Sequence, residues 1–163
     1  MDTHFLELIG QVLLAVAIVA VTAVLGGNLF DVIVNEKNLV KNFPASIGHI
    51  RGFYKYSNPG TFFQSLSPIY GVAVLAALLI FWPEAYGRRW LILGSIISYA
   101  ITQVITVVYF FPQNRLLREG PLDEVTKLFD EFATTRGRWD TLRNVLTLAA
   151  SVLLLVALAK PLP

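Results

Sequence analysis

The sequence predicts an all-α protein, an antiparallel bundle of four transmembrane helices with short amphipathic surface helices in its two long connections. The 163-residue chain is 55% hydrophobic and 15% charged, whereas soluble domains carry about 25% charged residues. Four apolar segments each reach the roughly 20 residues that a helix needs to cross a bilayer. Only a few residues separate the second and third segments, so their helices must be antiparallel neighbours.

The four predicted spans form one domain that covers residues 1–163. The spans lie at about residues 5–27, 62–82, 90–111 and 139–159. The first seven residues contain no Lys or Arg, so the first span is expected to be a retained helix and not a signal peptide. Pro112 is expected to end the third span, because proline removes a backbone donor and disrupts a helix.

Each long connection contains one predicted surface helix. Apolar residues recur at helical spacing within 45–56, which is typical of an amphipathic helix lying on a membrane. A second helix is predicted after Pro121, with Val125 and Phe129 on its apolar side. Gly137 is expected to separate this helix from the fourth span, since glycine weakens a helix interior.

Composition excludes several classes of function. The net charge of +2, without a basic cluster that carries aromatic residues, argues against nucleic acid as a partner. The absence of cysteine excludes disulfides, thiolate metal sites and cysteine nucleophiles. His4 and His49 are the only histidines, too few for a three-histidine metal site and too far apart for a bis-histidine haem. We expect no metal and no cofactor. The expected partners are membrane lipids, a hydrophobic aromatic ligand and further copies of the chain.

The basic residues indicate an orientation in the membrane. Nine of the 13 Lys and Arg residues lie in the two long connections, and Arg88, Arg89 and Lys160 lie on the other side. Because cytoplasmic loops are enriched in Lys and Arg, both termini are predicted to lie outside.

Polar residues of the third and fourth spans recur every three or four positions. Such spacing puts them on one face of each helix, and in a membrane a polar face should point towards protein or a cavity. We therefore expect the two polar stripes to share an interior cleft. They consist of Ser95, Tyr99, Thr102, Thr106 and Tyr109 on the third span, flanked by Gln103, and of Asp140, Arg143, Asn144, Thr147 and Ser151 on the fourth.

Asp140 and Arg143 are the strongest candidates for chemistry, and two interpretations fit them. At a spacing of three they form an ion pair near a helix start, where the helix dipole favours a carboxylate. Alternatively, Asp140 is a general base or ligand contact and Arg143 stabilises an anion. The residue types agree with both interpretations.

The other candidates also have a structural and a functional interpretation. Asn114 either caps the carbonyl groups at a helix end or lines the cleft. The tyrosines Tyr99 and Tyr109 either pack between helices or donate a hydrogen bond to a bound oxygen. Trp139 is an interfacial anchor by default and a stacking wall for a flat ligand as the alternative.

Two short motifs carry a resemblance to a known family. Phe111-Pro112-Gln113-Asn114-Arg115 follows the third span, and Trp139-Asp140-Thr141-Leu142-Arg143 begins the fourth. Together with the four-span layout, they resemble the anthrone oxygenase-like family of small integral membrane proteins. Many members of this family carry His or Asn after the Trp, where this chain has Asp140.

The resemblance implies oxidation of an anthrone-type polycyclic phenol to its quinone by dioxygen, without flavin or haem, in a bacterial inner membrane. It assigns Asp140 as the base and Trp139 as the stacking residue. In the same hypothesis Arg143 and Tyr109 steady the phenolate, and Asn114 orients the ligand.

Three further side chains are expected to contact the ligand in the same cleft: Tyr99, Gln103 and Asn144. The alternative is a non-catalytic role, either as a carrier of a lipid-like or quinone-like ligand or as a small subunit of a membrane complex. A cleft that opens beside Asp140 would favour ligand binding or catalysis, and stripes that interlock without a cavity would favour the subunit.

Overall fold

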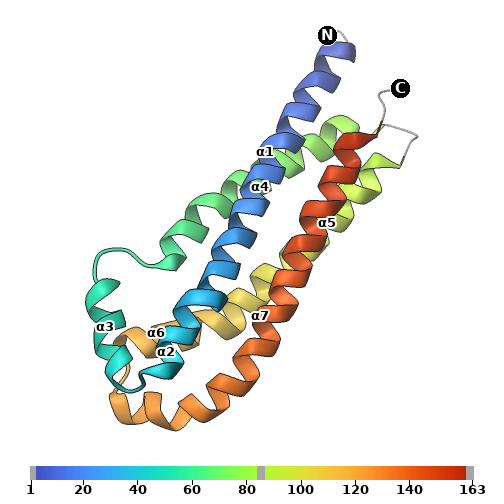
Figure 1. Cartoon of the computed structure of the whole chain (residues 1–163). Helices are drawn as coiled ribbons and strands as arrows, with labels where there is room; N and C mark the ends of the chain where they lie inside the picture. Colours follow the sequence, from blue (N-terminus) through green and yellow to red (C-terminus); the bar gives the residue numbers. More distant parts are fainter. Residues whose placement is uncertain (1–2, 84–86, 161–163) are drawn as a thin grey trace.

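The computed structural model describes residues 3–83 and 87–160, apart from the side chains of residue 128 and of residues 130–134. The side chain of residue 3 is likewise not described. The structure confirms the all-α fold, because none of the described residues forms a strand. Four long helices form one antiparallel bundle, shorter helices cover one end, and both ends of the chain lie at the other (Figure 1). Four helical segments are long and apolar enough to cross a membrane, over His4–Lys41, Pro59–Phe81, Arg88–Glu119 and Thr135–Ala159.

The helical elements follow one another closely along the chain. In order they are α1 (Thr3–Phe30), the π-helical η1 (Asp31–Glu36), α2 (Lys37–Lys41), α3 (Ala45–Phe53), α4 (Pro59–Phe81), α5 (Arg88–Ile105), the π-helical η2 (Thr106–Phe110), α6 (Phe111–Glu119) and α7 (Leu122–Ala159).

The predicted helix ends at Pro112 and Gly137 are wrong, because helices continue through both residues. Pro112 lies in the first turn of α6, directly after η2. The wider π-helical turn relieves the clash that a proline ring makes with the carbonyl group four residues earlier. Gly137 lies inside α7, so the second surface helix and the fourth span are one helix of 38 residues.

The packing of α1 against α4 depends on two glycines. A Cβ atom at Gly10 would lie 2.5 Å from the ring of Phe81, and one at Gly27 would lie 2.8 Å from the ring of Phe62. Glycine therefore lets both ends of α4 approach the backbone of α1. The two helices run antiparallel along their length (Figure 1) and share the largest contact surface in the bundle.

The end of the bundle that holds the termini is closed by a buried arginine. Arg88 is 1% exposed and its guanidinium lies 4.3 Å from the centre of the Phe81 ring. It also donates a hydrogen bond of 2.9 Å to the backbone oxygen of Lys160. This end of the bundle is therefore packed.

The opposite end contains a second, smaller hydrophobic core. It joins α2, α3, α6 and the start of α7, and the Phe43 and Phe129 rings stack beside it at 3.8 Å. Arg51 fastens α3 to α6 by donating to the backbone oxygens of Leu117, at 2.9 Å, and Gly120. Carbonyl groups at the end of a helix have no backbone N–H partner within that helix, so Arg51 caps the end of α6. The small core consists of Leu39, Ile47, Leu117 and Val125.

Candidate functional site

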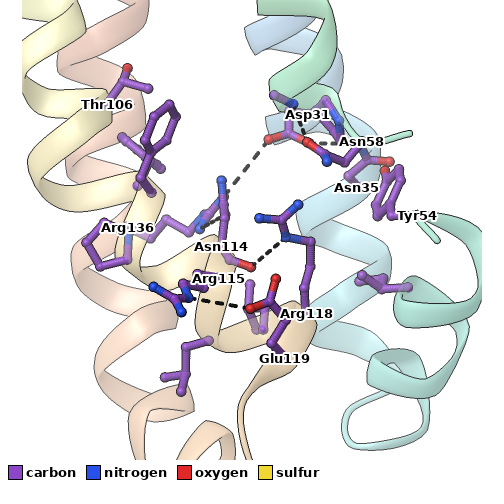
Figure 2. A pocket seen from close by; sticks show the side chains of 18 of the residues that line it. Asp31, Asn35, Tyr54, Asn58, Thr106, Asn114, Arg115, Arg118, Glu119 and Arg136 are labelled. Carbon is purple, nitrogen blue, oxygen red and sulfur yellow. Dashed lines mark hydrogen bonds and ion pairs between the residues drawn. The ribbon is translucent and has the colours of Figure 1, made fainter. Parts of the chain in front are cut away.

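A pocket of about 950 Å³ lies between the main core and the small core. Its walls come from η1, α3, the first turns of α4, η2, α6 and α7, and Figure 2 shows polar side chains reaching into it from several of these elements. Its volume is in the range of about 300–1,000 Å³ that small-molecule sites occupy. The charged and amide residues that line it are Asp31, Asn35, Glu36, Asn58, Gln64, Asn114, Arg115, Arg118, Glu119, Glu124, Arg136 and Arg143.

Both π-helical segments of the chain border this pocket. η1 contributes Asp31, Asn35 and Glu36, and η2 contributes Thr106 and Phe110. Side chains from the two segments face the pocket from different walls (Figure 2). A π-helical turn is less favourable than an α-helical turn and occurs frequently at functional sites. Two such turns from separate helices therefore make this pocket the candidate functional site.

Arg136 of α7 is the hub of an ion cluster on the pocket wall. Its guanidinium donates to Glu36 and, at 3.2 Å, to the side-chain oxygen of Asn114. It also lies 4.0 Å from the carboxylate of Asp31 and 3.7 Å from that of Asp140. The side chain is only 6% exposed, so this network joins η1, α6 and α7 in a largely water-free environment. We call Asp31, Glu36, Arg136, Asp140 and Arg143 the ion cluster.

Asp140 and Arg143 form the ion pair that their spacing predicts. The Arg143 guanidinium donates to Asp140 Oδ1 at 2.7 Å, and its carbon lies 4.1 Å from the centre of the Phe110 ring. Asp140 is 1% exposed and does not line the pocket, whereas Arg143 does. Arg143 makes this one hydrogen bond among the described residues, and a guanidinium has five N–H donors. It therefore keeps donors for a ligand oxygen.

Of the other predicted site residues, only Asn114 lines the pocket. Its side-chain oxygen accepts from Arg136, and its backbone oxygen accepts from Arg118 at 3.3 Å. Asn114 therefore belongs to the polar wall, and α6 continues through it for another turn. The interpretation as a helix-end cap does not fit a residue in the middle of a helix.

Tyr109, Trp139 and Asn144 lie outside the pocket lining. The rings of Tyr109 and Trp139 contact each other with their centres 5.6 Å apart, and Trp139 is 37% exposed. The hydroxyl of Tyr109 and the side-chain oxygen of Asn144 are buried without a hydrogen-bond partner among the described residues. These residues lie on η2 and α7, and their predicted ligand contacts remain predictions.

The part of the third-span polar stripe that lies away from the pocket is packed against neighbouring helices. Ser95 donates to the backbone oxygen of Ala150 at 2.9 Å and shares a 2.8 Å hydrogen bond with Tyr70. Tyr99 shares a 2.7 Å hydrogen bond with Ser67, and its ring centre lies 4.3 Å from that of Tyr70. Gln103 is half-buried and does not line the pocket. The pocket begins one turn below, at Thr106.

Three acidic and basic residues of the ion cluster were not singled out from the sequence as site residues. Asp31 and Glu36 follow the first apolar run, and Arg136 precedes the last one, 100 residues from Glu36. Their positions in the sequence could have indicated the cluster, because in the predicted four-span topology all three lie on the same side of the membrane as Asp140. Charges at the edge of a span that face the bundle interior are often functional.

Tyr54 adds a hydroxyl donor to the pocket wall from the end of α3. Burial, and to a smaller extent the nearby carboxylate of Asp31, raises the pKa of the Tyr54 hydroxyl above its ordinary value of 10.0. The group is therefore protonated at neutral pH and can donate a hydrogen bond to a ligand or to water in the pocket.

The chemistry available at this site is that of carboxylates, guanidiniums, amides and one phenol. Within the described parts of the chain, no group of three or more His, Cys, Asp or Glu side chains is arranged to hold a metal ion. The ion cluster contains three carboxylates and two guanidiniums, so its formal net charge is negative. An anion would meet net repulsion there, whereas a neutral acceptor such as a carbonyl oxygen would not.

Comparisons of the chain with protein-family models, with curated proteins and with solved structures found no match. The function is therefore argued from the pocket and from the residues that border it.

Proposed function

We propose that this chain is a multi-pass membrane protein that binds a flat hydrophobic ligand with a carbonyl group in the pocket between η1, η2 and α7. We further propose that it promotes the oxidation of this ligand by dioxygen, as the resemblance to anthrone oxygenases implies. The observation that carries the proposal is a ligand-sized pocket bordered by two π-helical turns and by the buried Arg143 and Arg136.

The pocket chemistry supports a neutral ligand with an oxygen acceptor. Arg143 lines the pocket and its guanidinium makes one hydrogen bond among the described residues, and Tyr54 supplies a protonated hydroxyl. Phe63, Phe110 and Phe111 contribute apolar surface to the same wall. The wall therefore offers apolar surface to a ring system beside groups that can donate a hydrogen bond to its oxygen, and sites for small organic molecules combine these two features.

The proposed reaction balances with dioxygen as the only co-reactant. A base removes the acidic C–H proton of the anthrone, and the resulting carbanion reduces dioxygen and forms a C–O bond to it. Loss of the second proton from the same carbon and cleavage of the O–O bond then give the quinone, and the other oxygen atom leaves as water with the two protons. The proton goes to a carboxylate of the ion cluster, which then has two charged carboxylates and two guanidiniums and no longer repels an anion. The negative charge that moves to the ligand carbonyl is stabilised by the Arg143 guanidinium more strongly than the neutral carbonyl is.

Of the three carboxylates in the ion cluster, Asp31 and Glu36 line the pocket, and we assign Glu36, which is bonded directly to Arg136, as the base. A general base must come within hydrogen-bonding reach of the proton it removes. Glu36 lines the pocket, whereas Asp140 is enclosed by Arg136 and Arg143 and does not. In this proposal Asp140 is a positioning residue that holds Arg143, and Glu36 takes the proton.

Glu36→Gln tests this assignment, with Glu7→Gln as the matched control at the other end of α1. The measurements are oxygen uptake with 1,8-dihydroxyanthrone and binding of the stable 1,8-dihydroxyanthraquinone to the protein in vesicles. We expect Glu36→Gln to bind the quinone and to lose oxygen uptake by about 100-fold, the typical contribution of a general base. Undiminished oxygen uptake by Glu36→Gln would refute its role as the base.

A binding role without catalysis is the second candidate, favoured by the charge pairing of the cluster. The Glu36 carboxylate is already bonded to the Arg136 guanidinium, and this contact would have to loosen before Glu36 could take a proton from a ligand. Quinone binding by the wild type, without oxygen uptake above that of protein-free vesicles, would establish this second function. Failure to bind the quinone would refute both.

A further inference from the structure

The side chains that join α4 to α5 form a series that ends at the pocket. Tyr70 bonds Ser95 at 2.8 Å, and one turn nearer the pocket Ser67 bonds Tyr99 at 2.7 Å. Gln64, one turn beyond Ser67 on α4, and Thr106, about two turns beyond Tyr99 on η2, both line the pocket. Beyond the Ser67–Tyr99 bond, the pocket therefore lies against both helices. Their whole contact is also much smaller than that of α1 with α4 or of α5 with α7.

The first turns of α4 are held on α1 and cannot close this gap. The rings of Phe62 and Phe63 lie against Gly27, with atoms 2.8 Å and 3.2 Å from the position that a Cβ atom would occupy there. On the other side of the gap, η2 turns with the wider π-helical geometry. The opening between α4 and η2 therefore results from the packing of α4 on α1 and from the π-helical geometry of η2.

Apolar side chains border this opening on the side of η2. Val107 on η2 and Phe111 at the start of α6 are 55% and 43% exposed. Both also line the pocket, so the pocket reaches the apolar outer face of the bundle. Both lie in a helical segment that is long and apolar enough to cross a membrane.

The pocket wall towards α6 and the start of α7 is charged instead. Arg115 pairs with Glu119 at 3.4 Å, both largely exposed, and Arg118 and Glu124 line the same part of the wall. A hydrophobic ligand passing this rim would separate charged groups from water without replacing their hydrogen bonds, which is costly. The apolar opening imposes no such cost.

We infer that the ligand reaches the pocket laterally from the bilayer, through a portal between Gln64 of α4 and Val107 of η2. The ligand is thus a neutral, membrane-dissolved molecule that approaches within the hydrocarbon layer and places its carbonyl against the ion cluster. This inference rests on the proposed ligand-binding function and adds the route and the physical state of the ligand. The Ser67–Tyr99 bond marks the inner end of the portal.

The chain contains no cysteine, so an engineered thiol pair can be cross-linked without side reactions. The portal variant carries Gln64→Cys and Val107→Cys, and the rim variant carries Arg118→Cys and Glu124→Cys. Bifunctional thiol reagents of graded length link each pair in protein reconstituted into phosphatidylcholine vesicles. Exchange of 1,8-dihydroxyanthraquinone is then measured before and after linking of the same variant.

We expect linking of the portal pair to slow exchange by about tenfold or more, as when an access route is closed, and linking of the rim pair to change it less than about twofold. The opposite pattern, slow exchange only after rim linking, would overturn lateral access. If the unlinked and wild-type proteins bind no quinone, the proposed function itself is refuted, and this outcome is distinct from a wrong route.

A second measurement needs no substitution. The lipid concentration is raised at a fixed total amount of quinone, which changes the quinone content of the bilayer and the free quinone in water by different factors. Lateral access requires the association rate of the wild type to follow the quinone content per lipid. A rate that follows the aqueous concentration alone would refute the portal.

Discussion

Replacing Arg136 with Met should be the most destabilising single change in the pocket wall. Arg136 contacts Asp31, Glu36 and Asp140, and these four side chains are 6%, 18%, 17% and 1% exposed. Methionine has a similar length, so the change removes the charge and leaves three carboxylates beside Arg143 alone. Removing one partner from a buried ion pair costs about 3–5 kcal/mol, because the remaining charge is buried without compensation.

The matched control is Arg115→Met, which breaks the ion pair with Glu119. Its side chains are 79% and 63% exposed, so solvent screens the pair and the expected loss is at most about 1 kcal/mol. Unfolding of both variants in mixed micelles, driven by an increasing fraction of dodecyl sulfate, gives the change in the free energy of unfolding. A loss for Arg136→Met no larger than that for Arg115→Met would refute the reasoning.

A double variant separates charge from packing at the same position. In Arg136→Met with Glu36→Gln, one of the uncompensated carboxylates is also neutralised. Residues in one ion network are not additive, so the double variant should lose less free energy of unfolding than the sum of the two single changes. A strictly additive result would mean that Arg136 stabilises the fold by packing on Phe110, which lies 5.0 Å from its guanidinium, and not by its charge.

Three further predictions concern the fold and can be measured in the same micellar assay. Gly10→Ala should cost about 1–3 kcal/mol, because its Cβ would lie 2.5 Å from the Phe81 ring, whereas Gly26→Ala, with nothing within 4 Å, should be neutral or stabilising. An equal loss in both variants would argue against close packing at the first. Tyr99→Phe removes the hydrogen bond to α4 and should lower the free energy of unfolding by about 1 kcal/mol, with no change expected if that bond does not form. Asn58→Ala removes the capping box at the start of α4 and should also cost about 1 kcal/mol, whereas the Ser replacement should retain most of the stability.

The sequence predicts the parts of this fold that depend on local pattern. Each span is a predominantly apolar run, and the period of 3.6 residues correctly places Ser95, Thr102, Thr147 and Ser151 on buried faces. The pairing of Asp140 with Arg143 is equally local, since three residues separate them on one helix. Such features need no information from the rest of the chain.

The ion cluster could not be assembled from the sequence because its contacts are not local. Glu36 meets Arg136 across 100 positions, and their contact depends on how α1 and α7 are rotated about their axes. The π-helical turns change that rotation. An α-helix from Asp31 would place Glu36 about 140° away from it, whereas the wider π-helical turn brings both towards the same wall. No residue type in η1 or η2 signals this geometry.

The π-helical turn before Pro112 explains why the predicted end of the third span was wrong. Proline is a sound indicator of a helix end when the preceding turn is α-helical. Here the preceding turn is η2, and the helix continues into α6. Asn114, which would otherwise be an exposed helix-end residue, is thereby held on the pocket wall beside Arg136.

The length of α7 has a consequence for how the two cores are connected. Its 38 residues measure about 57 Å along the helix axis at 1.5 Å per residue, nearly twice the roughly 30 Å thickness of the hydrocarbon layer. Arg136 and Asp140 lie near its middle, and the part before them packs on α3 and α6 through Val125. One continuous helix therefore joins the small core to the ion cluster, so Val125 and Arg136 are held in a fixed spacing while the backbone hydrogen bonds between them stay intact.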